Sequence, residues 1–228
     1  SFVQAHEALR ESLAERVRDW ALAPFAEDEA ASPGSRIAET SDEPEAFHAS
    51  EASEASEASE ASDLSDAPDA SKAIPERFIE LHAGIGFFTL PLARAGAAGI
   101  ALESDRSALA DLRANLGRAG LAGRVEVLAG RVERRGDLAL RLERADVLIV
   151  DPPRTGLDRP VRSAIATSGP RRIVYVSCDP ATLARDLRLL VEEGGYRLRE
   201  GRAFDLFPQT PHVETVVRLE REPRPVAR

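Results

Sequence analysis

From Arg77 onward the sequence predicts an α/β fold with a mostly parallel, doubly wound sheet. Short apolar runs alternate with longer segments of helical periodicity, which is the pattern of repeated strand–helix units. Most of these runs are continuous rather than alternating with polar residues, as expected for strands that are buried on both faces. The last two runs follow one another with no helical segment between them, so the sheet is expected to close with a β-hairpin.

The parallel part of the sheet is expected to contain five strands. They are 77–81, 99–103, 125–129, 146–151 and 172–176. Helices are expected at 89–95, 107–118, 137–144, 159–167 and 180–193, the last ending at a pair of glycines. The hairpin strands are expected at 196–207 and 214–221. Strand–helix units that close with a hairpin are typical of the Rossmann-like sheet of class I methyltransferases rather than of dehydrogenases.

An amphipathic helix is expected at 2–22, because apolar residues recur there at steps of three and four. Pro24 follows and ends it. The apolar face of this helix should carry Phe2, His6, Leu9, Leu13, Val17 and Trp20.

The next segment is acidic and of low complexity. Residues 27–71 carry 14 Asp and Glu against one basic residue, Arg36, and include four consecutive Glu-Ala-Ser triplets at 51–62. A period of three builds no apolar stripe on a helix, so we expect a disordered spacer. The whole chain has a net charge of −9 and this segment −13, which leaves +4 for the arginine-rich remainder. The expected parts are an N-terminal helix at 1–25, the acidic insert at 26–73 and the α/β domain at 74–228.

The composition bounds the class of protein. Cys178 is the only cysteine, which excludes an internal disulfide and any multi-cysteine metal or iron–sulfur site, so no metal is expected. No stretch is apolar enough for a signal peptide or a membrane span. We therefore expect a cytoplasmic monomer that does not bind membranes. The chain contains no methionine, and we expect it to be a piece of a longer protein or a processed product.

Two features predict a nucleoside site. Gly84 and Gly86 follow the first strand and precede a helix, where glycines let the backbone come close to a bound nucleoside. Glu103 ends the second strand, and a carboxylate at that place can accept hydrogen bonds from both ribose hydroxyls. Either NAD or S-adenosylmethionine would satisfy this pattern.

The sequence Asp151-Pro152-Pro153 lies at the carboxyl edge of the fourth strand, where ligands bind in open α/β sheets. The two prolines fix an extended backbone without amide donors, against which a flat base could pack. Asp-Pro-Pro also occurs at this place in enzymes that methylate exocyclic amines, so it predicts methyl transfer without identifying the accepting atom.

Cys178 ends the fifth strand, and Asp179 is well placed to cap the following helix. The helix end should lower the thiol pKa, whereas Asp179 should raise it. Taken by itself, a lone cysteine in this position is more often a buried core residue. However, His212 and Glu214 lie on the last loop and strand, which can face the same cleft. A cysteine and a carboxylate there suggest a nucleophile and a base.

Several stretches together resemble one family, the S-adenosylmethionine-dependent RNA (uracil-5-)-methyltransferases. They are FVQAH (2–6), ELHAGIGFFTLPLA (80–93), IVDPPRTGL (149–157), SCDPATLARDL (177–187) and DLFPQTPHVETV (205–216). The amino-acid sequences of the last two stretches are more similar to the ribosomal-RNA branch of the family than to the transfer-RNA branch. The resemblance implies methylation of C5 of a uridine in RNA, with 23S rRNA as the expected substrate and tRNA as the alternative.

The resemblance also implies roles for individual residues. The Cys178 thiolate would add to C6 of the uracil, and Glu214 would later remove the C5 proton. Cofactor contacts are implied for Gln4, His82, Gly84, Gly86, Glu103 and Asp151, with Asp151 also catalytic, and contacts to the RNA base for Pro152 and Arg154. Three positions depart from the family pattern: His82 replaces an aromatic residue, Phe87 a smaller one, and Arg131 an acidic residue that faces the adenine.

Members of the family usually carry N-terminal RNA-binding domains, which are expected to be absent from this chain. Three other functions remain as alternatives. A 5-methylcytosine RNA methyltransferase typically has a second cysteine where Arg154 stands, and an exocyclic-amine methyltransferase needs no cysteine at all. The chain could also be a truncated, catalytically silent RNA-binding module.

Overall fold

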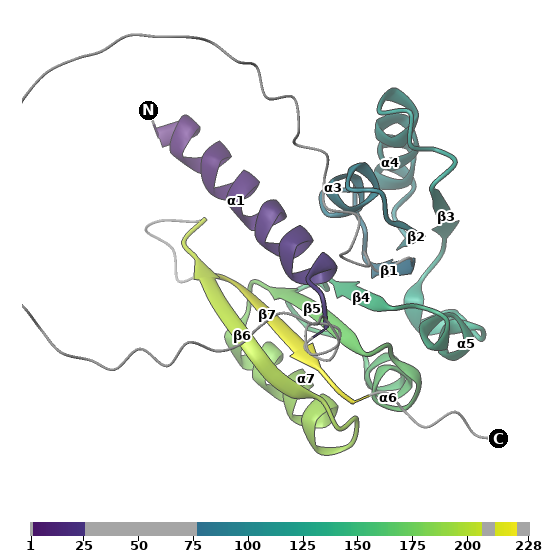
Figure 1. Ribbon diagram of the computed structural model, residues 1–228, viewed down its shortest axis with the longest axis vertical. Helices are drawn as coiled ribbons and strands as arrows, with labels where there is room; N and C mark the ends of the chain where they lie inside the picture. The colour runs from purple at the N-terminus through teal and green to yellow at the C-terminus, as the bar shows by residue number, and fades with distance from the viewer. Residues whose placement is uncertain (1, 26–76, 207–212, 223–228) are drawn as a thin grey trace, which may run out of the picture. The chain divides into compact units, whose positions relative to one another are not determined.

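The computed structural model describes residues 2–25, 77–206 and 213–222, with side chains from Glu7 onward. The expected acidic insert at 26–73 lies outside this range, as does His212. Within it the elements follow the predicted order (Figure 1). None of the described helices combines the length and the apolar character that a membrane span requires.

The described strands form one seven-stranded sheet in the order β3-β2-β1-β4-β5-β7-β6. Strands β1 to β5 pair in parallel, and β7 pairs antiparallel with both β5 and β6. This arrangement confirms the predicted fold class, a mostly parallel, doubly wound sheet with a C-terminal hairpin. The strands are β1 (Arg77–Leu81), β2 (Ala98–Glu103), β3 (Val125–Ala129), β4 (Val147–Val150), β5 (Arg172–Ser177), β6 (Arg197–Phe204) and β7 (Glu214–Glu220).

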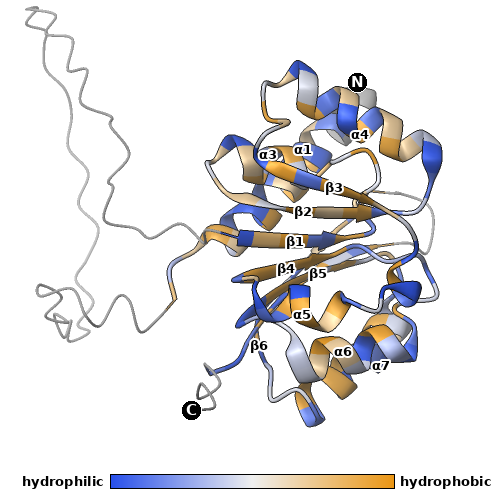
Figure 2. Cartoon of the chain, turned by 90° about the vertical axis from the view of Figure 1, so that its right-hand side faces the viewer, coloured by the Kyte–Doolittle hydropathy of each residue, from blue (hydrophilic) through white to orange (hydrophobic). Residues whose placement is uncertain are grey.

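Helices cover both faces of the sheet, and Figure 2 shows the apolar strands between the two layers. One core lies under α1, α3 and α4, and the other under α5, α6 and α7. Each expected helix is present with its ends within two residues of the prediction. The helices are α1 (Phe2–Leu22), α3 (Thr89–Arg94), α4 (Arg106–Arg118), α5 (Leu138–Glu143), α6 (Arg159–Ser168) and α7 (Pro180–Glu192).

Helix α1 packs on the sheet through a shorter stripe than predicted. Leu13, Val17 and Trp20 are buried in the first core, as expected. Leu9 was expected on the same face, but 37% of its surface is exposed. Among the side chains of α1 described from Glu7 onward, the buried stripe begins at Leu13, and Phe2 and His6 lie outside this range.

The carboxyl end of α1 is held by a buried arginine. Arg172, at the start of β5, is fully buried and donates hydrogen bonds to the carbonyl oxygens of Ala21 and Ala23. Its guanidinium also forms an ion pair with Glu220 of β7, at 2.7 Å between Nη2 and Oε1. The last carbonyl groups of a helix have no hydrogen-bond donor within the helix. The Arg172 side chain supplies that donor, and so it connects the end of α1 to β5, which carries Arg172, and to β7, which carries Glu220.

We predict that Arg172→Ala lowers the free energy of unfolding by about 3 kcal/mol, because it removes the buried donor of the α1 carbonyls and leaves Glu220 only its longer contacts, at 3.6 Å, with Arg199 and Arg218. Urea unfolding followed by circular dichroism measures this. Arg18→Ala is the control, since its ion pair with Asp19 is exposed and should contribute less than about 1 kcal/mol. Equal effects of the two substitutions would contradict the anchoring role.

Candidate active site

The carboxyl edge of the parallel strands brings the predicted site residues together. His82 follows β1, Glu103 ends β2 and Asp151 follows β4. Because the carboxyl ends of parallel strands meet at one edge of a sheet, these residues share that edge.

The antiparallel strand β7 runs in the opposite direction, so its first residue, Glu214, lies at the same edge of the sheet. Ser177 of β5 pairs with Thr215 of β7, so continuing the register by one residue brings Cys178 opposite Glu214. The fold therefore juxtaposes the two residues expected to act as nucleophile and base, which lie 36 positions apart in the sequence.

The glycine loop and Glu103 form a connected unit. The backbone N–H of Gly84 donates to Oε2 of Glu103 at 2.8 Å, and Oε1 accepts from the backbone N–H of Asp105 at 2.8 Å. Oε1 also accepts from the backbone N–H of Ser104 at 2.5 Å. These bonds fix the carboxylate and leave Oε2, which has the one donor, a second lone pair for a ligand. Gly84 has φ +55°, and a Cβ added there would meet no atom within 4 Å. The loop thus leaves open space beside an oriented carboxylate.

A hollow of about 430 Å³ lies over this unit. His82 and Glu103 line one part of it, and Arg131 and Glu133 another. His82 is half-buried, and burial lowers its pKa from the ordinary value, although the negative charges of Glu133 and Glu103 act in the opposite direction. The volume of the hollow lies in the range of small-molecule sites.

Glu133 was not singled out from the sequence. Arg131 occupies the position where an acidic residue was expected, and its side chain forms an ion pair with Glu133 at 3.2 Å. A carboxylate is therefore present in the hollow, two residues further along the chain. The turn of 3₁₀-helix at Val132–Arg134 places it there, and nothing in the sequence pattern alone distinguishes it from a solvent-exposed acid.

A second cavity of about 480 Å³ lies beside β4 and β7. It contains Asp151 and Glu214 together with apolar and aromatic side chains, and Arg10 of α1 also lines it. The guanidinium of Arg10 lies over the ring of Phe87, 5.5 Å from its centroid. Neither Arg10 as a lining residue nor this stacking was predicted. The apolar and aromatic members are Leu13, Phe87, Phe88, Val176 and Leu206.

Burial shifts the protonation of the acids in this cavity. It raises the pKa of Asp151 to about 7, and the negative charge of Glu214 contributes to the same shift. Burial also raises the pKa of Glu214. Among the residues that the structure describes, Oε2 of Glu214 is buried without a hydrogen-bond partner. A buried carboxylate oxygen without a partner is costly unless a ligand or a proton satisfies it, as expected for a functional group.

Cys178 is half-exposed at the start of α7. As predicted, the side chain of Asp179 caps this helix and accepts from the backbone N–H of Thr182 at 2.8 Å. On balance the pKa of the thiol is raised by burial and by the charge of Glu214, while Arg154 lowers it. The sequence argument weighed the helix end against Asp179 and so missed the dominant contributions, which come from residues distant in sequence.

The remaining residues predicted to contact the RNA base or the cofactor are Arg154, Pro152 and Gln4. Arg154 is exposed and lies close enough to Cys178 and Asp179 to affect the pKa of both. Pro152 is buried, whereas the exposed Pro153 lines the hollow near Glu103. Gln4 lies in the first turns of α1, and its side chain falls outside the described part of the structure.

Glu80 is a buried acid that the sequence analysis did not single out. It lies within β1, is almost fully buried and accepts a hydrogen bond from the Thr89 hydroxyl of α3. Burial raises its pKa to about 8 despite that bond, and the charges of Asp151 and Glu103 add to the shift. An acid within an otherwise apolar strand was the signal that could have identified it.

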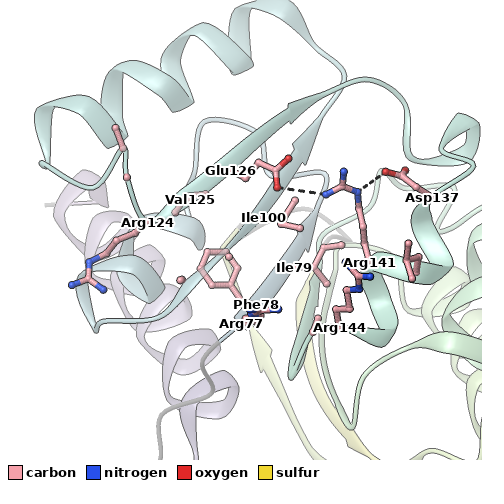
Figure 3. A pocket seen from close by; sticks show the side chains of 16 residues that line it. Arg77, Phe78, Ile79, Ile100, Arg124, Val125, Glu126, Asp137, Arg141 and Arg144 are labelled. Atoms are coloured by element: carbon pink, nitrogen blue, oxygen red, sulfur yellow. Dashed lines mark hydrogen bonds and ion pairs between the residues drawn. The ribbon is translucent and has the colours of Figure 1, made fainter. Parts of the chain in front are cut away.

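Another hollow, of about 600 Å³, lies at the opposite edge of the sheet (Figure 3). It is bordered by the amino-terminal ends of β1, β2 and β3. Its acids are already engaged, since Arg141 forms ion pairs with both Glu126 and Asp137. Ligands of open α/β sheets bind at the carboxyl edge, so this hollow is not the candidate active site.

Comparison with known proteins gives consistent results. The family model described as tRNA (Uracil-5-)-methyltransferase matches residues 58–222. A 23S rRNA uracil-C5-methyltransferase of Aromatoleum aromaticum is 44% identical over 147 residues, which cover 64% of this chain and 34% of that protein. An uncharacterized RNA methyltransferase of Gloeobacter violaceus is 47% identical over 143 residues, covering 63% of this chain and 30% of that protein. The chain therefore spans about a third of the length of these relatives.

Among solved structures, the chain is similar to the Pyrococcus abyssi tRNA (uracil-54, C5)-methyltransferase in complex with S-adenosyl-L-homocysteine. The two are 33% identical, with a TM-score of 0.56. The alignment covers 63% of this chain and 34% of the other.

The raised pKa of Glu80 predicts a pH dependence of stability. Between its ordinary pKa of 4.5 and about 8, the folded protein holds a proton that the unfolded chain releases, so the free energy of unfolding falls as pH rises. We predict that Glu80→Gln removes a slope of about 1.4 kcal/mol per pH unit between roughly pH 5 and 7. Urea unfolding at several pH values measures it.

Glu192→Gln, at an exposed position of α7, is the control and should retain the slope of the unmodified protein. An unchanged slope in Glu80→Gln would contradict a protonated Glu80 in the folded state.

Proposed function

The chain belongs to the tRNA (uracil-5-)-methyltransferase family, and we propose that it transfers a methyl group from S-adenosylmethionine to C5 of a uridine in RNA. One observation carries the proposal: the register of β5 and β7 brings Cys178 opposite Glu214, beside the cavity that contains Asp151. A thiol, a buried carboxylate and a nearby cofactor hollow are the groups that C5 methylation requires.

The residues at the carboxyl edge fit the cofactor. In this proposal the Glu103 carboxylate, whose orientation is fixed by Gly84, accepts hydrogen bonds from the ribose hydroxyls of the cofactor. The adenine occupies the hollow that Arg131 and Glu133 line. Gly86, His82 and Gln4 complete the proposed cofactor contacts, with Asp151 at the other end of the site. When bound, S-adenosylmethionine supplies an electrophilic methyl group.

Cys178 supplies the nucleophile. Its thiolate adds to C6 of the uracil, which places the electron pair of the C5–C6 bond on C5 and makes that carbon able to accept the methyl group. An unmodified uracil C5 is too weak a nucleophile, so a covalent bond to sulfur must form first. Because burial raises the pKa of the thiol, Arg154 has the role of stabilising the thiolate.

Glu214 completes the reaction. After methylation, C5 carries both the methyl group and a hydrogen, and the Glu214 carboxylate removes that hydrogen as a proton. The electron pair then re-forms the C5–C6 bond and expels the Cys178 thiolate. We assign Asp151 to the same cavity as an acid that is partly protonated near neutral pH, since its pKa is about 7. It would contact the base, which must leave any stack to reach Cys178, together with Arg154 and the proline pair.

We further propose that the substrate is 23S rRNA, because the relative from Aromatoleum aromaticum acts on that RNA. The structural relative from Pyrococcus abyssi acts on tRNA, which is the second candidate. In this proposal α1 and residues 74–228 form the catalytic domain, and the acidic segment at 26–73 is an insert within it. RNA affinity contributed by other domains of the relatives would be separate from the chemistry at Cys178.

The covalent step predicts a trapped complex with RNA whose uridines carry fluorine at C5. Fluorine cannot leave as a proton does, so the reaction stops after methylation with the RNA still joined to sulfur. Incubation with S-adenosylmethionine and this RNA should add the mass of RNA plus one methyl group to the protein, as measured by intact-protein mass spectrometry. Cys178→Ala should give no adduct. The absence of any adduct with the unmodified chain would favour a catalytically silent RNA-binding module.

The assigned base predicts a different arrest with ordinary uridine. Glu214→Gln keeps the shape of the side chain but removes the base, so proton removal should slow by about a hundredfold or more. Methylated RNA should then remain joined to Cys178 and be visible as a band of reduced mobility in a denaturing gel. Rapid turnover by Glu214→Gln would contradict the assignment.

A further inference from the structure

We propose that Asp186 is a positioning residue, which holds the loop at 152–158 against α7 so that Arg154 remains beside Cys178. The inference rests on the proposed function in one respect, the assignment of Cys178 as the nucleophile. Asp186 itself does not reach the reacting atoms and acts through the loop.

Asp186 lies on α7 and is fully buried, with 0% of its surface exposed. Its carboxylate accepts hydrogen bonds from three different elements. The donors are the backbone N–H of Leu157 at 2.8 Å, the hydroxyl of Tyr175 on β5 at 2.7 Å and Nη1 of Arg162 on α6 at 2.8 Å. Nε of Arg185 adds a fourth at 2.9 Å. Burying a carboxylate is costly, and the two guanidiniums and two neutral donors offset that cost.

The same network binds the loop from its other side. Nη2 of Arg185 donates to the carbonyl oxygen of Thr155 at 2.9 Å. The hydroxyl of Thr182 donates to the carbonyl oxygen of Arg154 at 3.1 Å. The loop begins with two prolines, which have no amide donors. Besides the Leu157 side chain, which is buried in the second core, the loop is attached to the body of the protein by α7 donating to loop carbonyls and by Asp186 accepting from the Leu157 N–H.

Gly156 shows how closely the loop lies against this network. A Cβ at that position would be 2.6 Å from Nη2 of Arg185 and 2.7 Å from Oδ2 of Asp186. Its φ of +69° also lies in the region that favours glycine. The loop can approach the buried carboxylate only because this residue has no side chain.

The position of Arg154 matters because of the charges that act on Cys178. The carboxylate of Glu214 faces the thiol from β7 and disfavours the thiolate, whereas the positive charge of Arg154 favours it. Asp179, the neighbour of Cys178, is itself influenced by Arg154. Displacing the loop would move the cation away and leave Glu214 and Asp179 beside the thiol.

Alkylation of Cys178 tests the proposal directly, because this is the only cysteine in the chain. Only the thiolate reacts with iodoacetamide, so the rate against pH gives the thiol pKa without cofactor or RNA. We expect Asp186→Asn, which removes the charge that holds Arg162 and Arg185, to slow alkylation at pH 7.5 by about three- to tenfold, the effect of a pKa rise of about 0.5 to 1. Arg154→Ala should give the same shift.

The double variant distinguishes positioning from a general loss of stability. If Asp186 acts through Arg154, then Asp186→Asn combined with Arg154→Ala slows alkylation no further than Arg154→Ala alone. Additive effects, or an unshifted pH profile in folded Asp186→Asn, would overturn the proposal. Asp137→Asn is the matched control, since it also removes a carboxylate that pairs with two arginines, Arg135 and Arg141, but at the opposite edge of the sheet, and its profile should match that of the unmodified protein.

Gly156→Ala keeps the proposal testable if Asp186→Asn does not fold, because it displaces the loop and leaves every charge in place. It should shift the profile in the same direction, and an unshifted profile would overturn the proposal. The readout is independent of methyl transfer. A fluorouridine adduct together with unshifted alkylation would reject the positioning role alone, whereas shifted alkylation without an adduct would reject the proposed function alone.

Discussion

The antiparallel pairing of β7 with β5 is the constraint on which the site depends. Parallel strands can deliver residues to their carboxyl edge only from the ends of strands that run in one direction. A strand that enters in the opposite direction places its first residue at the same edge, and here that residue is Glu214. The register between Ser177 and Thr215 then brings it opposite Cys178. A slip of one residue would turn the Glu214 side chain to the other face of the sheet.

Burial at this edge decides the protonation of its groups. Asp151, Glu80 and Glu214 all have a raised pKa, because the strands that carry them are covered on both faces and few described cations approach them. The same environment disfavours the Cys178 thiolate, whereas the nearby Arg154 favours it, so the proposed role of Cys178 as nucleophile depends on that cation. This links the chemistry to the loop at 152–158, and through it to the buried carboxylate of Asp186. The position of Arg154 beside Cys178 thus depends on hydrogen bonds that the loop forms with Asp186 and Thr182 of α7.

The sequence predicted the elements of the fold well, because its strands are continuous apolar runs separated by glycine, proline and helix caps. The cap of α7 by Asp179 and the glycine loop at Gly84 are local features of the same kind. What the sequence could not predict depends on partners that are distant along the chain. The direction of the Cys178 pKa shift, the clamp of α1 by Arg172 and the network of Asp186 each join residues from different elements. No periodicity or motif spacing encodes such contacts.

The central claim is that this edge of the sheet methylates C5 of uridine rather than another atom of an RNA base. The most direct measurement uses S-adenosylmethionine with a trideuterated methyl group, unmodified 23S rRNA and mass spectrometry of the digested nucleosides. We predict that the label appears as 5-methyluridine carrying three deuterium atoms, and that Cys178→Ala removes it. Label on cytidine, or on the exocyclic amine of adenosine or guanosine, would contradict the claim.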